Sequence, residues 1–125
     1  MVDKIRLDFG EIHVFQNFIV VFMDEGITVK PEYNPYLVDI ANKYFKNRPF
    51  GYITYRIHSY AVNPLVYIET SKIKNLAAFA IVSTNGLKKS NVEIEKRFMT
   101  KPFEHFTDLD VAKKWVDSFI KSHQD

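Results

Sequence analysis

The sequence predicts a mixed α/β domain in which strands and helices alternate. Two observations predict it: short runs with strand character, and segments between them whose apolar residues recur with the period of a helix. The expected order is β-β-β-α-β-α-β-α-β-α, a mixed sheet of five to six strands with about four helices. Alternation after the third strand indicates parallel pairs joined by right-handed crossovers. A chain of 125 residues is expected to form one domain, residues 1–125.

The N-terminal residues predict an antiparallel meander. Residues 4–9 alternate between apolar and charged side chains, and residues 11–17 alternate again. Gly10 is expected to turn the chain between these two strands. The run FIVVFMDE, which begins at Phe18, reads as a third strand, and its nearly unbroken apolar character indicates burial on both faces.

The first helix is predicted by one apolar stripe. The stripe has the 3.6-residue period of a helix and consists of Tyr36, Leu37, Ile40, Ala41, Tyr44 and Phe45. Two starts are open. Asn34 could cap the helix with Pro35 as its first residue, or the helix could begin earlier, at Pro31. The helix is expected to end near Arg48, because the following proline disfavours helical backbone there.

The middle of the chain predicts a strand, a polar loop, a helix and a second strand. FGYITYRI (50–57) mixes β-branched and aromatic residues, as strands do. Asn63 and Pro64 read as the cap and first residue of a helix over LVYIETSKI. LAAFAIVST (76–84) is apolar through Val82, which is typical of a central parallel strand buried on both sides.

The last elements are predicted by capping residues. Ser90 and Glu93 form a capping box for a further helix. FEHF, near residues 103–106, is expected to be a short edge strand. Asp108 is expected to cap a final helix with a wide apolar face.

The stretch FGYITYRIHSYAVNPLVYIETSKIKNLAAFAIVS resembles the SpoIIAA-like superfamily, the STAS and Sec14-type β-α superhelix. The likeness extends over nearly the whole chain and is greatest to small bacterial members without an assigned function. It implies a single STAS-like domain. In anti-anti-sigma STAS proteins, a phosphorylatable serine, usually behind an aspartate, begins the helix after this middle strand. Here Asn63-Pro64 holds that place, and Ser59 and Tyr60 are the nearest hydroxyls, which puts such a switch in doubt.

Composition narrows the classes of function. The 17 basic and 15 acidic residues give a net charge of +2, too small to indicate nucleic acid or an anionic membrane as a partner. The chain has no cysteine, which excludes disulfides and thiolate sites, and the longest apolar runs are too short for stable membrane insertion. The charged N-terminus does not resemble a signal peptide. A cytoplasmic protein is expected, and a homodimer is left open.

The loop RIHSYAVN (56–63) is the candidate site. It concentrates polar side chains at the carboxyl end of a strand, where ligands bind in open α/β sheets: Arg56, His58, Ser59, Tyr60 and Asn63. Lys88, in the loop after the next strand, is expected on the same rim. An anion or a protein partner could bind there, beside the positive end of the following helix. The alternative is that Arg56 pairs with a neighbouring carboxylate and Asn63 only caps.

No catalytic or metal-binding pattern accompanies this loop. His58 and Ser59 are adjacent, and neighbouring side chains of an extended segment point to opposite faces. The four histidines lack metal-ligand spacing, and the four glycines are not clustered around a phosphate. We therefore expect no catalytic residue, metal or cofactor. His13 and His105 are expected to be surface or cross-strand residues.

Two functional hypotheses follow. The first is a non-enzymatic, STAS-like regulatory or interaction module that binds a protein partner or a small anionic ligand at 56–63, with Ser59 as a candidate phosphorylation site. The second is a small carrier protein or enzyme with an aromatic-lined pocket for an apolar or lipid-like ligand. It is motivated by the 15% content of aromatic residues.

Overall fold

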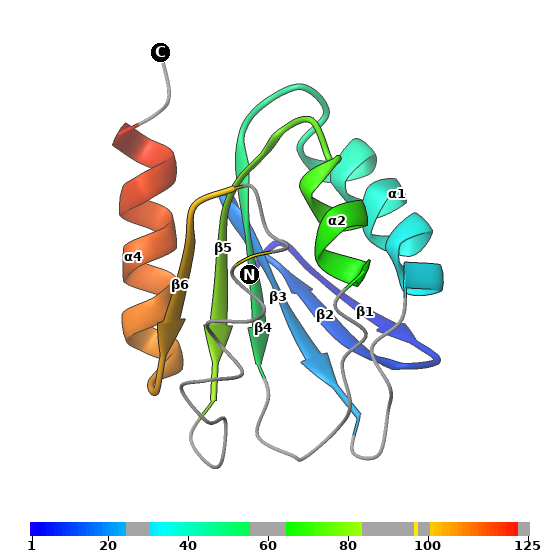
Figure 1. Ribbon diagram of the computed structural model, residues 1–125, viewed down its shortest axis with the longest axis horizontal. Helices are drawn as coiled ribbons and strands as arrows, with labels where there is room; N and C mark the ends of the chain where they lie inside the picture. Colours follow the sequence, from blue (N-terminus) through cyan, green and yellow to red (C-terminus); the bar gives the residue numbers. More distant parts are fainter. Residues whose placement is uncertain (25–30, 56–64, 84–96, 98–100, 123–125) are drawn as a thin grey trace.

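A computed structural model describes residues 1–24, 31–55, 65–83, 97 and 101–122 of the chain. These residues form a six-stranded sheet in the order β1-β2-β3-β4-β5-β6 (Figure 1). The strands are β1 (Asp3–Leu7), β2 (Gly10–Val14), β3 (Phe18–Met23), β4 (Phe50–Tyr55), β5 (Leu76–Val82) and β6 (Phe103–Phe106). The helices are the 3-10 turn η1 (Pro31–Tyr33), α1 (Asn34–Tyr44), α2 (Leu65–Ser71) and α4 (Leu109–Ser122).

The sheet is mixed, as predicted. β1, β2 and β3 pair in antiparallel fashion, whereas β3, β4, β5 and β6 are parallel neighbours. The meander is confirmed in its strand pairing and differs at its first turn. The prediction that Gly10 turns the chain is wrong, because Asp8 and Phe9 form the turn and Gly10 is already paired with Leu7 and with Met23.

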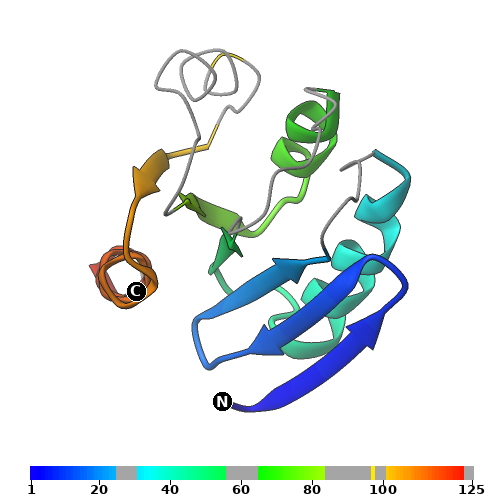
Figure 2. The ribbon, with the colours of Figure 1, turned by 90° about the horizontal axis from the view of Figure 1, so that it is seen from below.

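Helices cover both faces of the sheet. α1 and α2 lie side by side over one face, and α4 is the helix among the described residues that lies over the other (Figures 1 and 2). β5 carries buried side chains toward both layers: Phe79 and Ile81 toward α1 and α2, and Ala80 and Val82 toward α4. The prediction of a central parallel strand buried on both sides is therefore confirmed.

The described residues contain three α-helices, fewer than the expected four. Of the expected helix after Ser90, only Arg97 is among the described residues, and its backbone is helical. α2 spans 7 residues, about two turns, and its expected cap, Asn63, also lies outside the described residues.

Helix starts follow the capping prediction in one case and depart from it in another. Asp108 Oδ1 accepts hydrogen bonds from the backbone N–H groups of Asp110 (2.8 Å) and Val111 (3.1 Å), which confirms it as the cap of α4. Asn34 is not the cap of α1, because η1 precedes the helix and Tyr33 holds the cap position. The side chain of Asn34 is buried instead, and its Oδ1 accepts a hydrogen bond from Thr70 of α2.

The turn that follows α1 contains a residue with unusual backbone geometry. Lys46 has a φ of 46°, in the left-handed region that favours glycine, and its N–H donates to the carbonyl of Ala41 at 3.0 Å. Asn75 holds this end in place, since its Nδ2 donates to the carbonyl oxygens of Lys46 (2.8 Å) and Arg48 (3.0 Å). A lysine is thus retained at a position where the backbone prefers glycine.

Replacement of Lys46 by glycine is expected to stabilise the protein. Glycine adopts the left-handed conformation without the steric cost of a Cβ, so we expect Lys46→Gly to raise the free energy of unfolding by about 1 kcal/mol. Lys46→Ala is the matched control, because it also removes the ammonium group but keeps the Cβ. Urea denaturation should rank Lys46→Gly above both Lys46→Ala and the parent chain. Equal stability of the two variants would contradict the backbone explanation.

Candidate functional site

The residues of the predicted site lie outside the described residues. This holds for all six of them: Arg56, His58, Ser59, Tyr60, Asn63 and Lys88. The strands that lead toward them are described. β4 and β5 are parallel neighbours, and Tyr55 and Val82 pair at their carboxyl ends. The two segments therefore continue from the same edge of the sheet, while the positions of the six side chains stay a prediction.

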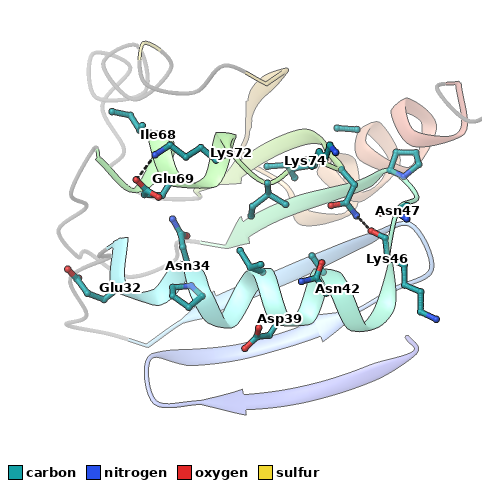
Figure 3. Close-up of a pocket in the computed structure, with 18 of the residues that line it drawn as sticks. Glu32, Asn34, Asp39, Asn42, Lys46, Asn47, Ile68, Glu69, Lys72 and Lys74 are labelled. Carbon is teal, nitrogen blue, oxygen red and sulfur yellow. Dashed lines mark hydrogen bonds and ion pairs between the residues drawn. The ribbon is translucent and has the colours of Figure 1, made fainter.

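The described residues form a groove between α1 and α2. Its volume is about 1370 Å³, and it lies between the two helices on their face of the sheet (Figure 3). Buried Ile73 and Leu76 contribute to its lining. Leu65 lines the groove and is the first residue of α2. One wall of the groove therefore begins two residues after the predicted binding loop 56–63 in the sequence.

Exposed aliphatic side chains border this groove. Val38 of α1 is 37% exposed, and Leu65 and Ile68 of α2 are 53% and 38% exposed. Leu65 and Ile68 are three residues apart and so share one face of a helix. Single exposed apolar residues are ordinary on a soluble protein, but three around one hollow form an apolar patch that marks a candidate binding surface.

Charges are distributed unevenly along the groove. Glu32, just before α1, lies at one end, and Lys46 and Lys74 lie toward the other (Figure 3). Glu69 and Lys72 form an ion pair of 3.1 Å within the α2 segment. Among the described residues, no opposite charge pairs with Glu32, Lys46 or Lys74. The groove therefore has an acidic end and a basic end whose charges are available to a bound partner.

The interior beside the groove contains a buried polar contact. Thr70 Oγ1 of α2 lies 3.3 Å from Asn34 Oδ1 of α1, and both residues are less than a tenth exposed. A buried hydrogen bond fixes relative position more strictly than apolar packing does, because it has a preferred distance and direction. This contact helps to hold the two helices at the spacing that leaves the groove open.

The aromatic residues mostly fill the core. Phe45 stacks on Phe50 at 4.7 Å, and Tyr52, Phe79 and Phe103 form a continuous stack at 4.9 and 5.2 Å. None of the described residues that line the groove is aromatic. The high aromatic content is therefore accounted for largely by core packing.

The two described histidines are cross-strand residues. His13 of β2 packs on Phe22 of β3 with ring centroids 4.6 Å apart, and its Nε2 lies 3.3 Å from Glu11 Oε1. Burial, with a smaller effect from Lys4 and Lys113, lowers the pKa of His13, which favours the neutral ring. His105 of β6 has a buried Nε2 to which no described residue is hydrogen-bonded. Within the described ranges, no three His, Cys, Asp or Glu side chains come together as a metal site.

Sequence reasoning missed the groove, although one signal was present. Val38 falls outside the apolar stripe that predicts α1, and an apolar residue off the core stripe of a helix is a candidate for an exposed contact. Leu65 and Ile68 gave no such signal, because their helix has too few turns for a buried face and an exposed face to be separated by period.

Comparison with known proteins supports the fold and no more. No model of a protein family matches the chain, and no curated protein matches it. Among solved structures, the chain is similar to an uncharacterized protein of the DUF3478 family from Shewanella loihica PV-4, which has a SpoIIAA-like fold. The TM-score is 0.56 at 14% identity, and the match covers 91% of this chain and 90% of that one. The chain thus has a SpoIIAA-like fold, as its central stretch predicts.

None of the described helices combines the length and the apolar character that crossing a bilayer requires.

Proposed function

We propose that this chain is a non-enzymatic, STAS-like interaction module of the cytoplasm, which binds a protein partner through the α1–α2 groove and through the loop 56–63, which precedes α2 in the sequence. The observation that carries the proposal is the set of exposed aliphatic side chains, Val38, Leu65 and Ile68, around an open groove. Protein interfaces combine such an apolar centre with a polar rim. Here Glu32 and Lys46 would belong to the rim, as would Arg56 and Lys88 of the predicted site.

A charge placed in the groove is expected to abolish partner binding. Ile68→Glu would bury a carboxylate against the partner's apolar surface, and loss of one central contact typically weakens binding at least about tenfold. Val111→Glu is the matched control, because Val111 is also an exposed aliphatic residue, at 52%, but lies on α4 over the other face of the sheet. Each variant would serve as bait in a cross-linking pull-down, quantified by mass spectrometry.

Comparing the two variants tests whether the groove is the binding surface. Parent chain and Val111→Glu should capture the same partner, and Ile68→Glu should lose it. Capture of the same proteins by all three would contradict the groove as the binding surface. A further bait with Arg56→Ala and Ser59→Ala tests whether the predicted loop contributes. Phosphoproteomics tests Ser59 itself, where a phosphate would add nearly two negative charges six residues before α2 begins in the sequence.

A carrier protein is the second candidate function, and the size and aliphatic lining of the groove favour it. A hollow of about 1370 Å³ is ample for a lipid-like molecule. The ligand would contact aliphatic rather than aromatic side chains. Native mass spectrometry of the protein purified from cells should then show an added apolar mass that Ile68→Glu removes. A clean apo mass would leave the interaction module as the better account.

A further inference from the structure

The surface of α2 supplies both a ridge and one wall of a groove. Leu65 and Ile68 of α2 are 53% and 38% exposed, and both also line the hollow between α2 and α1. An exposed apolar ridge beside an apolar groove can be complementary to a second copy of itself. In that arrangement, the α2 ridge of each protomer lies in the groove of the other, as ridges and grooves interlock between packed helices.

The charges along the groove fit the same arrangement. A two-fold axis perpendicular to the groove reverses its direction in the second copy, and every contact then occurs twice. The acidic end, with Glu32, faces the partner's basic end, with Lys46 and Lys74. None of these three residues has an opposite charge beside it among the described residues; Asp39, which also lines the groove, lies on α1 between the two ends (Figure 3). A groove with charges of one sign at both ends would repel its own copy.

The groove is also large enough to form one side of a protein–protein interface. Nineteen described residues line the groove, close to the roughly 20–30 residues that each side of a standard interface contributes.

The backbone of Lys46 is a separate observation in favour of a functional surface. Lys46 occupies a left-handed backbone position that glycine would satisfy better. Residues kept in unfavourable backbone conformations occur preferentially at functional sites.

We propose that the partner in the α1–α2 groove is a second copy of this chain, bound about a two-fold axis that places Glu32 of each protomer beside Lys46 and Lys74 of the other. The inference rests on the proposed function of the groove as a binding surface and names its occupant. Because the two α2 helices would run antiparallel, their helix dipoles would also be favourably opposed.

Charge reversal tests this arrangement directly. The full chain would be studied by sedimentation velocity at about 100 µM, where an interface of micromolar Kd is mostly occupied. The parent chain should sediment as a dimer. Glu32→Lys places like charges at both ends of the interface, and so does Lys46→Glu with Lys74→Glu. Each of these two variants is expected to raise the dimer Kd about tenfold or more at low salt.

A mixture of the two reversed variants gives the decisive result. In the mixed dimer, both ends again bring opposite charges together, so equimolar mixing should return the Kd to near that of the parent chain, well below the Kd of either variant alone. Native mass spectrometry would identify the heterodimer by its mass. Ile68→Glu should abolish the dimer and Val111→Glu should retain it. Because the substitutions are at exposed positions, thermal melts should remain close to that of the parent chain.

The inference fails if the parent chain is a monomer at this concentration. It also fails if the dimer persists in Ile68→Glu, or if mixing the reversed variants restores nothing. The proposed function would survive a monomeric parent chain that still captures a different protein in a manner sensitive to Ile68→Glu. A dimer formed through the groove, without capture of any other protein, would make the second copy the sole partner found.

Discussion

Gly51→Ala is expected to lower the free energy of unfolding by about 3 kcal/mol, the upper range for adding a methyl group to a packed core. Gly51 lies on β4, where the sheet meets α4. A Cβ at this position would overlap Val116 Cγ1 and would also lie 3.4 Å from Phe18 Cβ. Val116 is fully buried and branched at its Cβ, so it cannot turn aside as the end of a flexible side chain would. Urea denaturation monitored by circular dichroism measures the loss.

A double-mutant cycle with Val116→Ala tests the cause of that loss. Val116→Ala alone leaves a cavity and should cost about 2 kcal/mol. In the double variant, the new methyl group on residue 51 would occupy the vacated space. The stability lost by the double variant should therefore be smaller than the sum of the two single losses by at least about 1 kcal/mol.

The control for this cycle is Ile81→Val, a core change on the other face of the sheet. Combined with Gly51→Ala, it should be additive within about 0.5 kcal/mol. Additive costs for Gly51→Ala and Val116→Ala would show that steric overlap with α4 is not the reason for glycine at position 51.

The sequence predicts the elements because their signals are local. The apolar run of β5 and the alternation in β1 each depend on which neighbours along the chain are apolar. Asp108 was identifiable as a cap because a capping side chain bonds to the backbone two or three residues further on. Gly51 carries no such signal: the reason for it is a contact with Val116, 65 residues away, which exists only after α4 has packed on the sheet.

Asn34 shows how a tertiary contact overrides a local rule. An asparagine before a proline is a strong candidate for a helix cap. The side chain instead contacts Thr70 on a different helix, inside the protein, and the 3-10 turn η1 leads the chain into α1 without a side-chain cap. The position of the helix was predictable, and the role of its first residue was not.

The groove was not predictable for a related reason. Whether an aliphatic side chain such as Val38 or Ile68 is buried depends on how closely α1 and α2 approach, and the sequence of either helix alone does not determine this spacing. The site predicted from the polar loop 56–63 required only that β4 and β5 be parallel neighbours. The pairing of Tyr55 with Val82 meets this requirement. The groove and the loop are linked through α2.

Gly10→Ala is the second substitution with a large expected effect, at least about 2 kcal/mol of lost stability. Gly10 begins β2 and pairs with Met23 of β3. An added Cβ would overlap the backbone carbonyl oxygen of Phe22 and would lie 3.1 Å from Met23 Cα. Both obstacles belong to the main chain, so β2 and β3 would have to separate locally and lose hydrogen bonds of their ladder. Hydrogen exchange should then report reduced protection at the start of β2 and the end of β3.

The contrast with Gly51 makes this prediction specific. No side-chain truncation can relieve a clash with backbone atoms, so Met23→Ala combined with Gly10→Ala should show additive losses, whereas Val116→Ala should partly compensate for Gly51→Ala. Alanine also restricts the unfolded chain, and this effect alone favours folding by about 0.4–1 kcal/mol. If the variant is nevertheless destabilised, the strain in its folded state must exceed that amount. A Gly10→Ala protein as stable as its parent would mean that β2 and β3 accommodate a side chain at this position, and that the close approach of the two strands does not require glycine.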